Sequence, residues 1–270
     1  MKLFVYYRIS DKGNPKAKLP NGDKFSCLKN AIKEFGSENI HVIADNCEPQ
    51  TIHYIQSFKD QGIILEETSL GNSGSFMYMI NEIIKTHKAD DFVYLLEDDY
   101  LHLPGSKKAI LEGLEIADYV TLYDHPDKYL LDGNRGNPFN YRQLQKTRLY
   151  LTASTHWRET NSTTMTFSCK VKSLIDDYKI WKKYTKSAIP QDFYAFCEIT
   201  QNNILDMFMF FLRSRKKKFR ILFFILFRNQ FRRKKIKKLI SALPAFATHT
   251  ESLHLSPIVD WKKINNGQSN

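Results

Sequence analysis

The first half of the chain alternates short apolar runs with stretches in which apolar residues recur every three or four positions. The runs are typical of buried parallel strands, and they predict strands at 2–9, 41–44, 63–65, 92–96 and 119–123. The stretches between them predict helices at 25–35, from Pro49 to before Gly62, at 76–86 and at 105–117. This alternation implies right-handed crossovers. We therefore expect an α/β fold with a mainly parallel sheet flanked by helices.

The second half of the chain is less regular and predicts a smaller region of mixed structure. A loop rich in Asp, Gly, Asn and Pro runs to about Asn140, and its length suggests a substrate-binding segment or a lid. Apolar runs at 150–154 and 163–168 predict an antiparallel pair that encloses residues 156–159. Pro190 marks the start of a later helix, with Asp192 in its first turn.

The composition is that of a globular protein. Of the 270 residues, 42% are hydrophobic and 13% aromatic, which is enough for one large core. The four cysteines, Cys27, Cys47, Cys169 and Cys197, form no Cys-x-x-Cys pair. This argues against a zinc knuckle or a dense disulfide framework, and favours a reduced, cytoplasmic setting. The apolar run at the N-terminus is too short for a signal peptide and is expected to be a core strand.

The net charge of +11 is concentrated in one segment. Residues 213–238 contain 13 Lys or Arg and no acid, so the rest of the chain carries 27 bases against 29 acids. Nucleic-acid binding by the protein as a whole thereby loses its main support. The apolar run 221–227 is far shorter than the ~20 residues that span a bilayer. The segment predicts an amphipathic helix on an anionic membrane surface; the alternative is a solvated basic helix whose aromatic residues pack on the domain.

Three consecutive carboxylates, Glu97, Asp98 and Asp99, follow the strand predicted at 92–96. Adjacent acids repel one another and lose hydration near a buried strand end. A divalent cation would compensate for both effects. The structural alternative is a solvated turn after the strand.

Other polar residues are predicted to reach the same edge of the sheet. Arg8 lies near the end of the first strand, Asp45 follows the second, and Gly71 and Asn72 belong to a small-residue turn, 70–76, before a helix. The ligand crevice of a parallel sheet lies at the carboxyl ends of its strands. A turn of small residues lets a ligand approach the backbone and the helix N-terminus, where anions are favoured. The convergence of these residues predicts a binding site at this edge.

Four features, in this order, resemble the nucleotide-sugar-dependent glycosyltransferases of the GT-A fold, and most closely their family 2-like inverting members. The features are Asp45 after the second strand, 97–99 at the Asp-x-Asp position, Asp192 at a late helix, and His249 near the C-terminus. The chain departs from that pattern by having Glu97 at the first acidic position and a long basic stretch between Asp192 and His249. The resemblance implies a GT-A-like, Rossmann-like fold. It also implies transfer of a sugar from a nucleoside-diphosphate donor to a hydroxyl acceptor, with Mn²⁺ or Mg²⁺ bridging the diphosphate.

The resemblance assigns expected roles to individual residues. Asp98 and Asp99 would hold the cation, and His249 could add a ligand, since imidazole suits Mn²⁺ better than Mg²⁺. Asp192 would take the acceptor proton as general base. Contacts to the donor are expected from five residues: Arg8, Asp45, Gly71, Asn72 and Asp98.

Each of these residues also has a structural alternative. Arg8 could form an ordinary ion pair, Asp45 a turn, Asp192 a helix-terminus carboxylate, and His249 a hydrogen-bonded histidine near the core. Two other classes of function stay open: a nucleotidyltransferase that uses a nucleoside triphosphate, and a non-catalytic adaptor that binds membranes or nucleic acid through residues 213–238.

The expected division of the chain follows these roles. Residues 1–123 would form the nucleotide-sugar-binding half, and residues 124–212 the acceptor-side half with the candidate base. Residues 213–238 would form the membrane-surface segment, and residues 239–270 would close the fold. The acceptor is expected to be a glycan or a lipid-linked hydroxyl. The expected localisation is cytoplasmic, peripheral on the inner face of the membrane.

Overall fold

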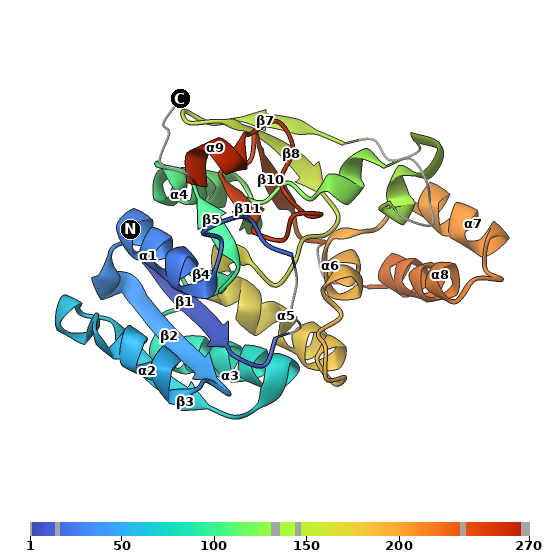
Figure 1. The fold of residues 1–270 in the computed structure, drawn as a ribbon. Helices are drawn as coiled ribbons and strands as arrows, with labels where there is room; N and C mark the ends of the chain where they lie inside the picture. The colour runs from blue at the N-terminus through green and yellow to red at the C-terminus, as the bar shows by residue number, and fades with distance from the viewer. Residues whose placement is uncertain (1, 14–16, 131–135, 144–146, 233–235, 266–270) are drawn as a thin grey trace.

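The computed structural model describes residues 2–13, 17–130, 136–143, 147–232 and 236–265. A nine-stranded sheet runs through the molecule in the order β3-β2-β1-β4-β9-β6-β10-β8-β7 (Figure 1). Its strands are β1 Leu3–Ser10, β2 Ile40–Asp45, β3 Ile64–Thr68, β4 Phe92–Glu97, β6 Tyr119–Thr121, β7 Leu149–Leu151, β8 His156–Thr160, β9 Phe167–Lys170 and β10 Leu239–Leu243.

The sheet has a parallel half and a mixed half. Strands β3, β2, β1 and β4 pair in parallel. Strand β9 then runs antiparallel to both β4 and β6. Strand β10 is parallel to β6 but antiparallel to β8, and β7 completes a hairpin with β8. This arrangement confirms the predicted α/β fold, with its parallel core and its smaller mixed region.

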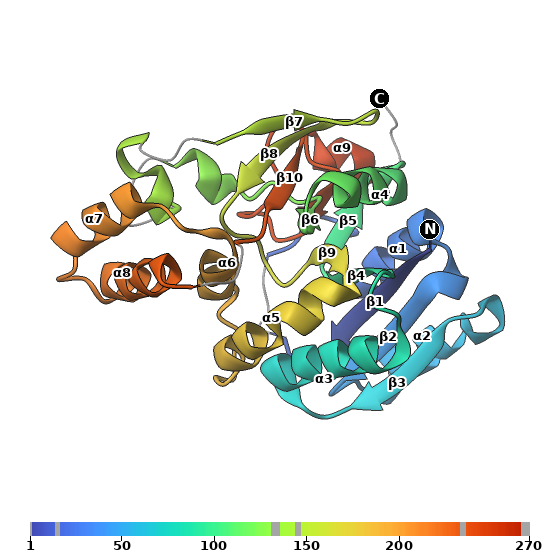
Figure 2. The same ribbon diagram turned by 180° about the vertical axis from the view of Figure 1, so that it is seen from behind.

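Helices cover both faces of the sheet, as Figures 1 and 2 show. The helices are α1 Lys24–Phe35, α2 Pro49–Gln56, α3 Gly71–Thr86, α4 Ser106–Ile116, α5 Val171–Tyr184, α6 Asp192–Thr200, α7 Ile204–Leu212, α8 Lys217–Gln230 and α9 Trp261–Asn265. Apolar residues of α1, α2 and α4 pack in one buried cluster with one face of the sheet. Those of α3, α5 and α6 pack in a second cluster with the opposite face. Side chains of β1 alternate between the two clusters and most are buried, so both faces of the sheet need a helical cover.

Local sequence signals begin and end the first helix. The Asp23 carboxylate accepts hydrogen bonds from the backbone N–H groups of Phe25 and Ser26, which leaves two fewer unpaired donors at the helix N-terminus. Gly36 follows the last residue with φ of 84°, a backbone conformation that favours glycine. The predicted helix at 25–35 is therefore confirmed to within one residue at its start.

Two elements differ from the sequence-based expectation. The small-residue turn predicted at 70–76 is helical from Gly71, so α3 begins five residues before the expected Phe76. The pair predicted between 150–154 and 163–168 is wrong, because β7 pairs with β8 across a tight turn in which Thr152 N–H bonds the Thr155 carbonyl. An apolar run indicates that a strand is buried but not which strand it pairs with. Strand β9 pairs with β4 and β6 instead.

Two further features frame the candidate site. A short antiparallel pair, β5 Tyr100–His102 with β11 Ala247–His249, brings the C-terminal part of the chain against the end of β4. Helices α7 and α8 pack on each other and project from the body of the molecule in both views (Figures 1 and 2). Among the described residues, no helix is both long enough and apolar enough to cross a membrane.

Candidate active site at the carboxyl edge of the parallel strands

The parallel half of the sheet brings the predicted polar residues to one edge. In the strand registers Arg8 lies beside Glu97, and Ser10 beside Asp45. The backbone N–H of Ser10 donates to Asp98 Oδ2 at 3.0 Å. The carboxyl ends of β1, β2 and β4 therefore gather Arg8, Asp45 and the acidic triplet, as the sequence predicted.

Arg8 links this edge to the start of α3. Its Nη2 lies 2.7 Å from Glu97 Oε1, and its Nη1 donates to the backbone carbonyl and the side-chain oxygen of Asn72 at 2.5 and 2.6 Å. The Arg8 side chain is only 7% exposed. Both terminal nitrogens thus hold protein groups, Glu97 at the end of β4 and Asn72 in the first turn of α3. The ion pair expected as an alternative for Arg8 is present. Gly71, with φ of 73°, immediately precedes this contact.

The acidic triplet is half-buried and crowded with like charge. Burial raises the pKa of Asp98 to about 6, and the Asp99 carboxylate adds to the rise, while the Ser10 hydrogen bond opposes it. Burial also raises the pKa of Glu97, even though Arg8 favours its ionised form. Carboxylates in this state gain from a nearby cation, because it offsets both the lost hydration and the repulsion.

Asp99 pairs with the predicted residue His249. Its Oδ2 lies 3.0 Å from His249 Nε2. The backbone N–H of Glu251 donates to the other ring nitrogen, Nδ1, at 3.1 Å. Since Nδ1 accepts this hydrogen bond, it carries no proton. The hydrogen of the ring then lies on Nε2, which donates a hydrogen bond to Asp99. His249 therefore orients the Asp99 carboxylate, and it could ligate a cation through Nε2 only after losing the hydrogen bond from Glu251.

The donors at this edge fit a cation that is completed by a ligand. In the part of the chain that is described, no three His, Cys, Asp or Glu side chains are arranged to hold a metal ion by themselves. A Mg²⁺-like ion needs only one or two carboxylates from the protein when phosphate oxygens and water fill its other positions. Asp98 and Asp99 supply hard oxygen donors of that kind.

Asp45 lies at the end of β2 and is 2% exposed. Its Oδ1 accepts from the Leu70 backbone N–H at 2.6 Å and from the Thr68 hydroxyl at 2.9 Å, and its Oδ2 accepts from Asn46 Nδ2 at 2.9 Å. The carboxylate thereby holds the segment between β3 and α3 against β2. In this conformation its hydrogen bonds are made to the protein itself.

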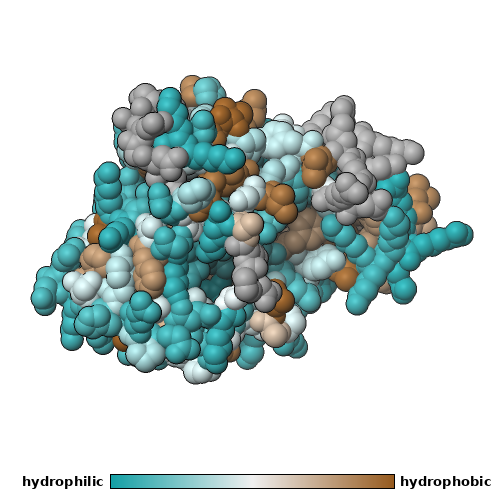
Figure 3. Space-filling view, in the orientation of Figure 1, coloured by the Kyte–Doolittle hydropathy of each residue, from teal (hydrophilic) through white to brown (hydrophobic). Residues whose placement is uncertain are grey.

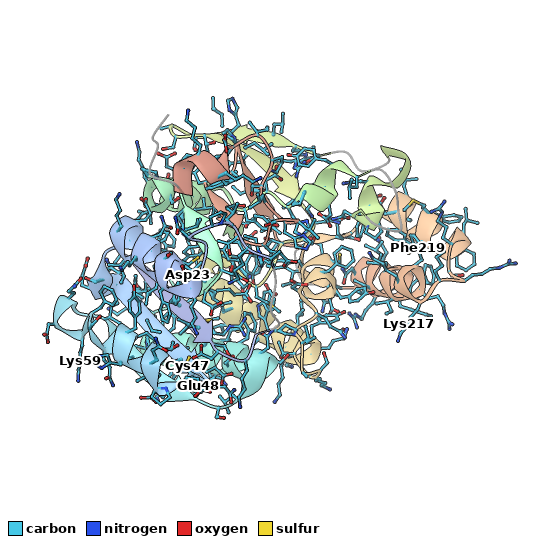
Figure 4. The ribbon with its side chains drawn as sticks, in the orientation of Figure 1. Asp23, Cys47, Glu48, Lys59, Lys217 and Phe219 are labelled. Carbon is cyan, nitrogen blue, oxygen red and sulfur yellow. The ribbon has the colours of Figure 1, made fainter. Side chains whose placement is uncertain are left out.

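A cavity of about 270 Å³ opens beside Asp45. Sequence reasoning missed its lining, because most of these residues are ordinary loop residues with no motif. Figure 4 labels two of them, Cys47 and Glu48, beside the ends of β1 and β2. The full lining is Lys12, Ala44, Asn46, Cys47, Glu48, Ile52, Glu67, Thr68 and Ser69.

Asp192 opens α6, as predicted, on the mixed side of the sheet. Burial raises its pKa to about 7, the N–H of Phe193 opposes the rise, and the Glu97 carboxylate adds to it. His125 and Asp127 also act on this carboxyl group electrostatically. Asp192 therefore lies close enough to Glu97 for the two charges to interact.

Residues 124–129 bring further charged groups to this region, and the sequence analysis did not single them out. His125 Nδ1 lies 2.9 Å from Asp127 Oδ1, and Asp124 forms an ion pair with Arg158 at 2.7 Å. Lys128 Nζ donates to Ser162 Oγ at 2.7 Å, and burial lowers the pKa of this amine to about 8. The signal available in the sequence was the density of charge directly after a predicted strand, in the loop expected to bind substrate.

Comparison with known proteins leaves the family open. No protein-family model and no curated protein matches the sequence. Among solved structures, residues 1–349 of S. aureus TarS are 14% identical, with 73% of this chain and 56% of that chain covered and a TM-score of 0.42. The chain thus spans little more than half the length of that structure.

Two other solved structures have similar sequence identities and TM-scores. A CMP:2-keto-3-deoxy-manno-octonic acid synthetase complexed with CTP is 13% identical, with 67% of this chain and 78% of that chain covered and a TM-score of 0.42. The galactosyltransferase LgtC, in complex with donor and acceptor sugar analogues, is 10% identical, with 71% and 68% covered and a TM-score of 0.41. At these values the comparisons identify neither a family nor an activity.

Proposed function

We propose that this protein is a glycosyltransferase of the GT-A type that moves a sugar from a nucleoside-diphosphate sugar to a hydroxyl acceptor with inversion. The proposal rests on one observation: burial, together with the charge of Glu97 in the half-buried acidic edge at the ends of the parallel strands, raises the pKa of Asp192 to about 7. The acceptor we propose is a glycan or a lipid-linked hydroxyl. Nucleic acid is not the proposed partner.

The proposed donor site lies along the ends of β1, β2 and β4. Asp98 and Asp99 would hold Mn²⁺ or Mg²⁺, whose charge stabilises the departing diphosphate. His249 would orient Asp99 through the 3.0 Å contact. Arg8 would contact the nucleotide by exchanging one of its contacts to Asn72 or Glu97 for the ligand. Asp45 would fix the adjoining segment, with Gly71 and Asn72 at the start of α3.

Asp192 is the proposed general base. An acceptor hydroxyl must lose its proton as it attacks the sugar, and a carboxylate with a pKa near the working pH is suited to accept it. A nucleotidyltransferase is the second candidate, because it also uses a parallel sheet, carboxylates and a divalent cation. Attack by a phosphate or a carboxylate on a nucleoside triphosphate requires no such base, since the attacking oxygen is already anionic. Asp192 therefore favours a hydroxyl nucleophile, as sugar transfer requires, over attack by a phosphate or a carboxylate.

A ligand screen tests the proposal. The melting temperature of the full chain would be measured with nucleoside diphosphates, their sugars and nucleoside triphosphates, each with and without Mn²⁺. We expect stabilisation by one diphosphate and its sugar that requires Mn²⁺ and is lost in Asp99→Asn, since a ligand stabilises the fold it binds. Products with the stabilising donor would then be analysed. Release of pyrophosphate from a triphosphate would favour the second candidate, and stabilisation by none of the ligands would contradict both.

A further inference from the structure

Helices α7 and α8 expose an apolar surface that has no cover among the described residues. On α7 its members recur at helical spacing, as do those on α8, so each helix presents one stripe. Each of these side chains is between 47% and 77% exposed. Its members, named here the apolar face, are Ile204, Leu205, Phe208, Phe211, Leu212, Phe224, Phe227 and Phe231.

The exposure of this face is not a consequence of poor packing between the helices. Phe210 of α7 and Phe219, Leu222 and Leu226 of α8 form a separate buried cluster with Cys197. The partly buried Phe223 connects the two helices on the outer side, with its ring centroid 5.3 Å from that of Phe211. The apolar run expected to meet the membrane as a whole is therefore divided: part of it packs inward, and α7 supplies exposed residues that the sequence analysis did not include.

Basic side chains accompany the apolar face. The turn between the two helices and the first turn of α8 expose Arg215, Lys216, Lys217 and Arg220, and Arg228 is exposed further along α8. From Arg213 to Arg232 the sequence has no acid. Figure 4 labels Lys217 and Phe219 on α8, and Figure 3 shows hydrophilic side chains projecting at this end of the molecule, with hydrophobic ones beside them.

The two helices are held firmly to the body of the protein. Glu198 of α6 is 3% exposed and pairs with Arg228 and Arg232 as well as with Lys183 of α5. Asn229 Nδ2 donates to the Gln201 carbonyl at 2.7 Å. Near the N-terminus of α8, the Lys218 ammonium lies 5.2 Å from the ring centroid of Phe193, the residue after Asp192. The apolar face thus has a fixed relation to the candidate active site.

We infer that the apolar face docks on an anionic membrane surface. Phe and Leu side chains would enter the boundary between headgroups and acyl chains while the flanking Lys and Arg meet anionic headgroups. A second copy of the chain fits less well, because a symmetric contact through this face would bring the two sets of basic residues together. Nucleic acid would satisfy the charges but leave eight large apolar side chains without a partner. This inference goes beyond the proposed function and does not depend on it.

Vesicle flotation of the full chain tests the docking surface. Vesicles of phosphatidylcholine would be compared with vesicles that also contain phosphatidylglycerol, over a series of salt concentrations. We expect binding to the anionic vesicles that weakens as salt rises. The double variant Phe208→Ser/Phe227→Ser should bind about tenfold less or weaker still, since both side chains lose burial in the bilayer. The triple variant Arg215→Gln/Lys217→Gln/Arg220→Gln should lose about tenfold to 10²-fold, on anionic vesicles only.

Matched variants elsewhere on the surface serve as controls. Leu149→Ser/Leu151→Ser removes two leucines of β7 that are also exposed, and should bind as the wild type does. Asp99→Asn should bind vesicles normally while losing donor binding. A failure of the docking inference can therefore be distinguished from a failure of the proposed function. Melting curves would verify that each variant is folded.

Four outcomes would overturn the inference. One is equal flotation of the wild type and the Phe208/Phe227 variant, and another is the absence of wild-type binding to either kind of vesicle. The third is a wild-type dimer in light scattering that the Phe208/Phe227 variant dissociates, which would identify a second copy as the partner. Preference for a DNA duplex over anionic vesicles at physiological salt would likewise replace the membrane as partner.

Discussion

Two carboxylate groups of this protein, the buried Glu198 and the half-buried Asp98, lie in opposite electrostatic settings. Burial alone would raise the pKa of Glu198, but hydrogen bonds from Lys183 and Tyr184, together with Arg228, hold it below its ordinary value. At the end of β4, burial and the neighbouring Asp99 instead raise the pKa of Asp98 to about 6. Glu198 has its positive partners within the fold, whereas the acidic triplet has a surplus of negative charge.

This contrast separates a structural ion cluster from a candidate site. Basic groups from α5 and α8 meet at Glu198 and tie the helices together, so its charge serves the fold. Arg8 pairs with Glu97 and His249 with Asp99, but the three adjacent acids still repel one another, and keeping them together costs stability. Proteins tolerate such a cost where a ligand or a reaction uses it, and strongly perturbed carboxyl groups are accordingly concentrated at functional sites.

The largest expected effect is on the rate of transfer, at Asp192, whose carboxylate would accept the acceptor proton. Asp192→Asn should lower the transfer rate by about 10²-fold or more with little change in donor affinity, as expected for the loss of a general base. The asparagine can still accept from the Phe193 N–H, so the helix start is preserved. In the wild type the rate should rise with pH through about 7, as Asp192 loses its proton, and this limb should be absent in the variant. Steady-state kinetics across pH would check both points.

A normal rate in Asp192→Asn, together with a lower melting temperature, would assign this residue to the fold instead. The rising limb of the pH profile would then have to come from another group.

A smaller effect is expected at Glu198, and on stability alone. Glu198→Gln should lower the free energy of unfolding by about 2–3 kcal/mol, less than for a fully buried pair because Lys183 and Arg228 are 42% and 46% exposed. Because the pKa of Glu198 is depressed in the folded state, the wild-type advantage should be fully present above the ordinary Glu value. It should be lost as pH falls below that value and through the lower pKa of the folded state. Urea unfolding at several pH values would measure it.

Asp176→Asn provides the control for Glu198. Asp176 is 30% exposed and also pairs with two lysines, Lys172 and Lys237. The Asp176→Asn substitution should therefore lower the free energy of unfolding by less than about 1 kcal/mol. Equal losses in the two variants would remove the distinction between the Glu198 cluster and an ordinary surface pair.

The smallest effect has the opposite sign. The raised pKa of Asp98 means that the folded wild type loses stability as pH rises from 3.8 to about 6, where only the folded state still holds this proton. The rise in pKa corresponds to about 3 kcal/mol at most, which solvent screening of this half-buried carboxylate reduces. Asp98→Asn lacks the pH dependence and should be more stable than the wild type by about 1 kcal/mol above pH 6. Donor binding should weaken in the same variant. Unfolding curves at pH 5 and pH 8 would show the difference, and a loss of stability at pH 8 would mean that the Asp98 charge supports the fold.

The sequence predicted the parallel half of the molecule well because its information there is local. Apolar runs and helical spacing identify each strand and helix, and parallel pairing then brings Arg8, Asp45 and the acidic triplet to one edge without further knowledge. The start of α3 was misplaced because small residues at 71–75 have weak helix propensity, which packing overrides.

The mixed half depended on partners that local patterns do not encode. Burial of the run in β9 was evident, but its position between β4 and β6 was not. Likewise, the pairing of Arg8 with Glu97, 89 residues apart, and the assignment of His249 as a donor to Asp99 emerge only from side-chain geometry. The exposed stripe on α7 escaped notice because a mostly apolar helix does not reveal which side faces the protein.

The position of β10 has a consequence for the order of assembly. Residues 239–243 fill the gap between β6 and β8, strands that precede them by about 80 to 120 positions in the chain. As the chain leaves the ribosome, the parallel strands β1 to β4 can pair early. Strands β6 and β8 each keep one edge unpaired until β10 is synthesised, and an unpaired edge can pair with strands of other chains. His249 of β11 arrives with the same late segment and only then reaches Asp99. A nascent chain stalled before β10 would thus present open edges to chaperones and lack one side of the acidic edge.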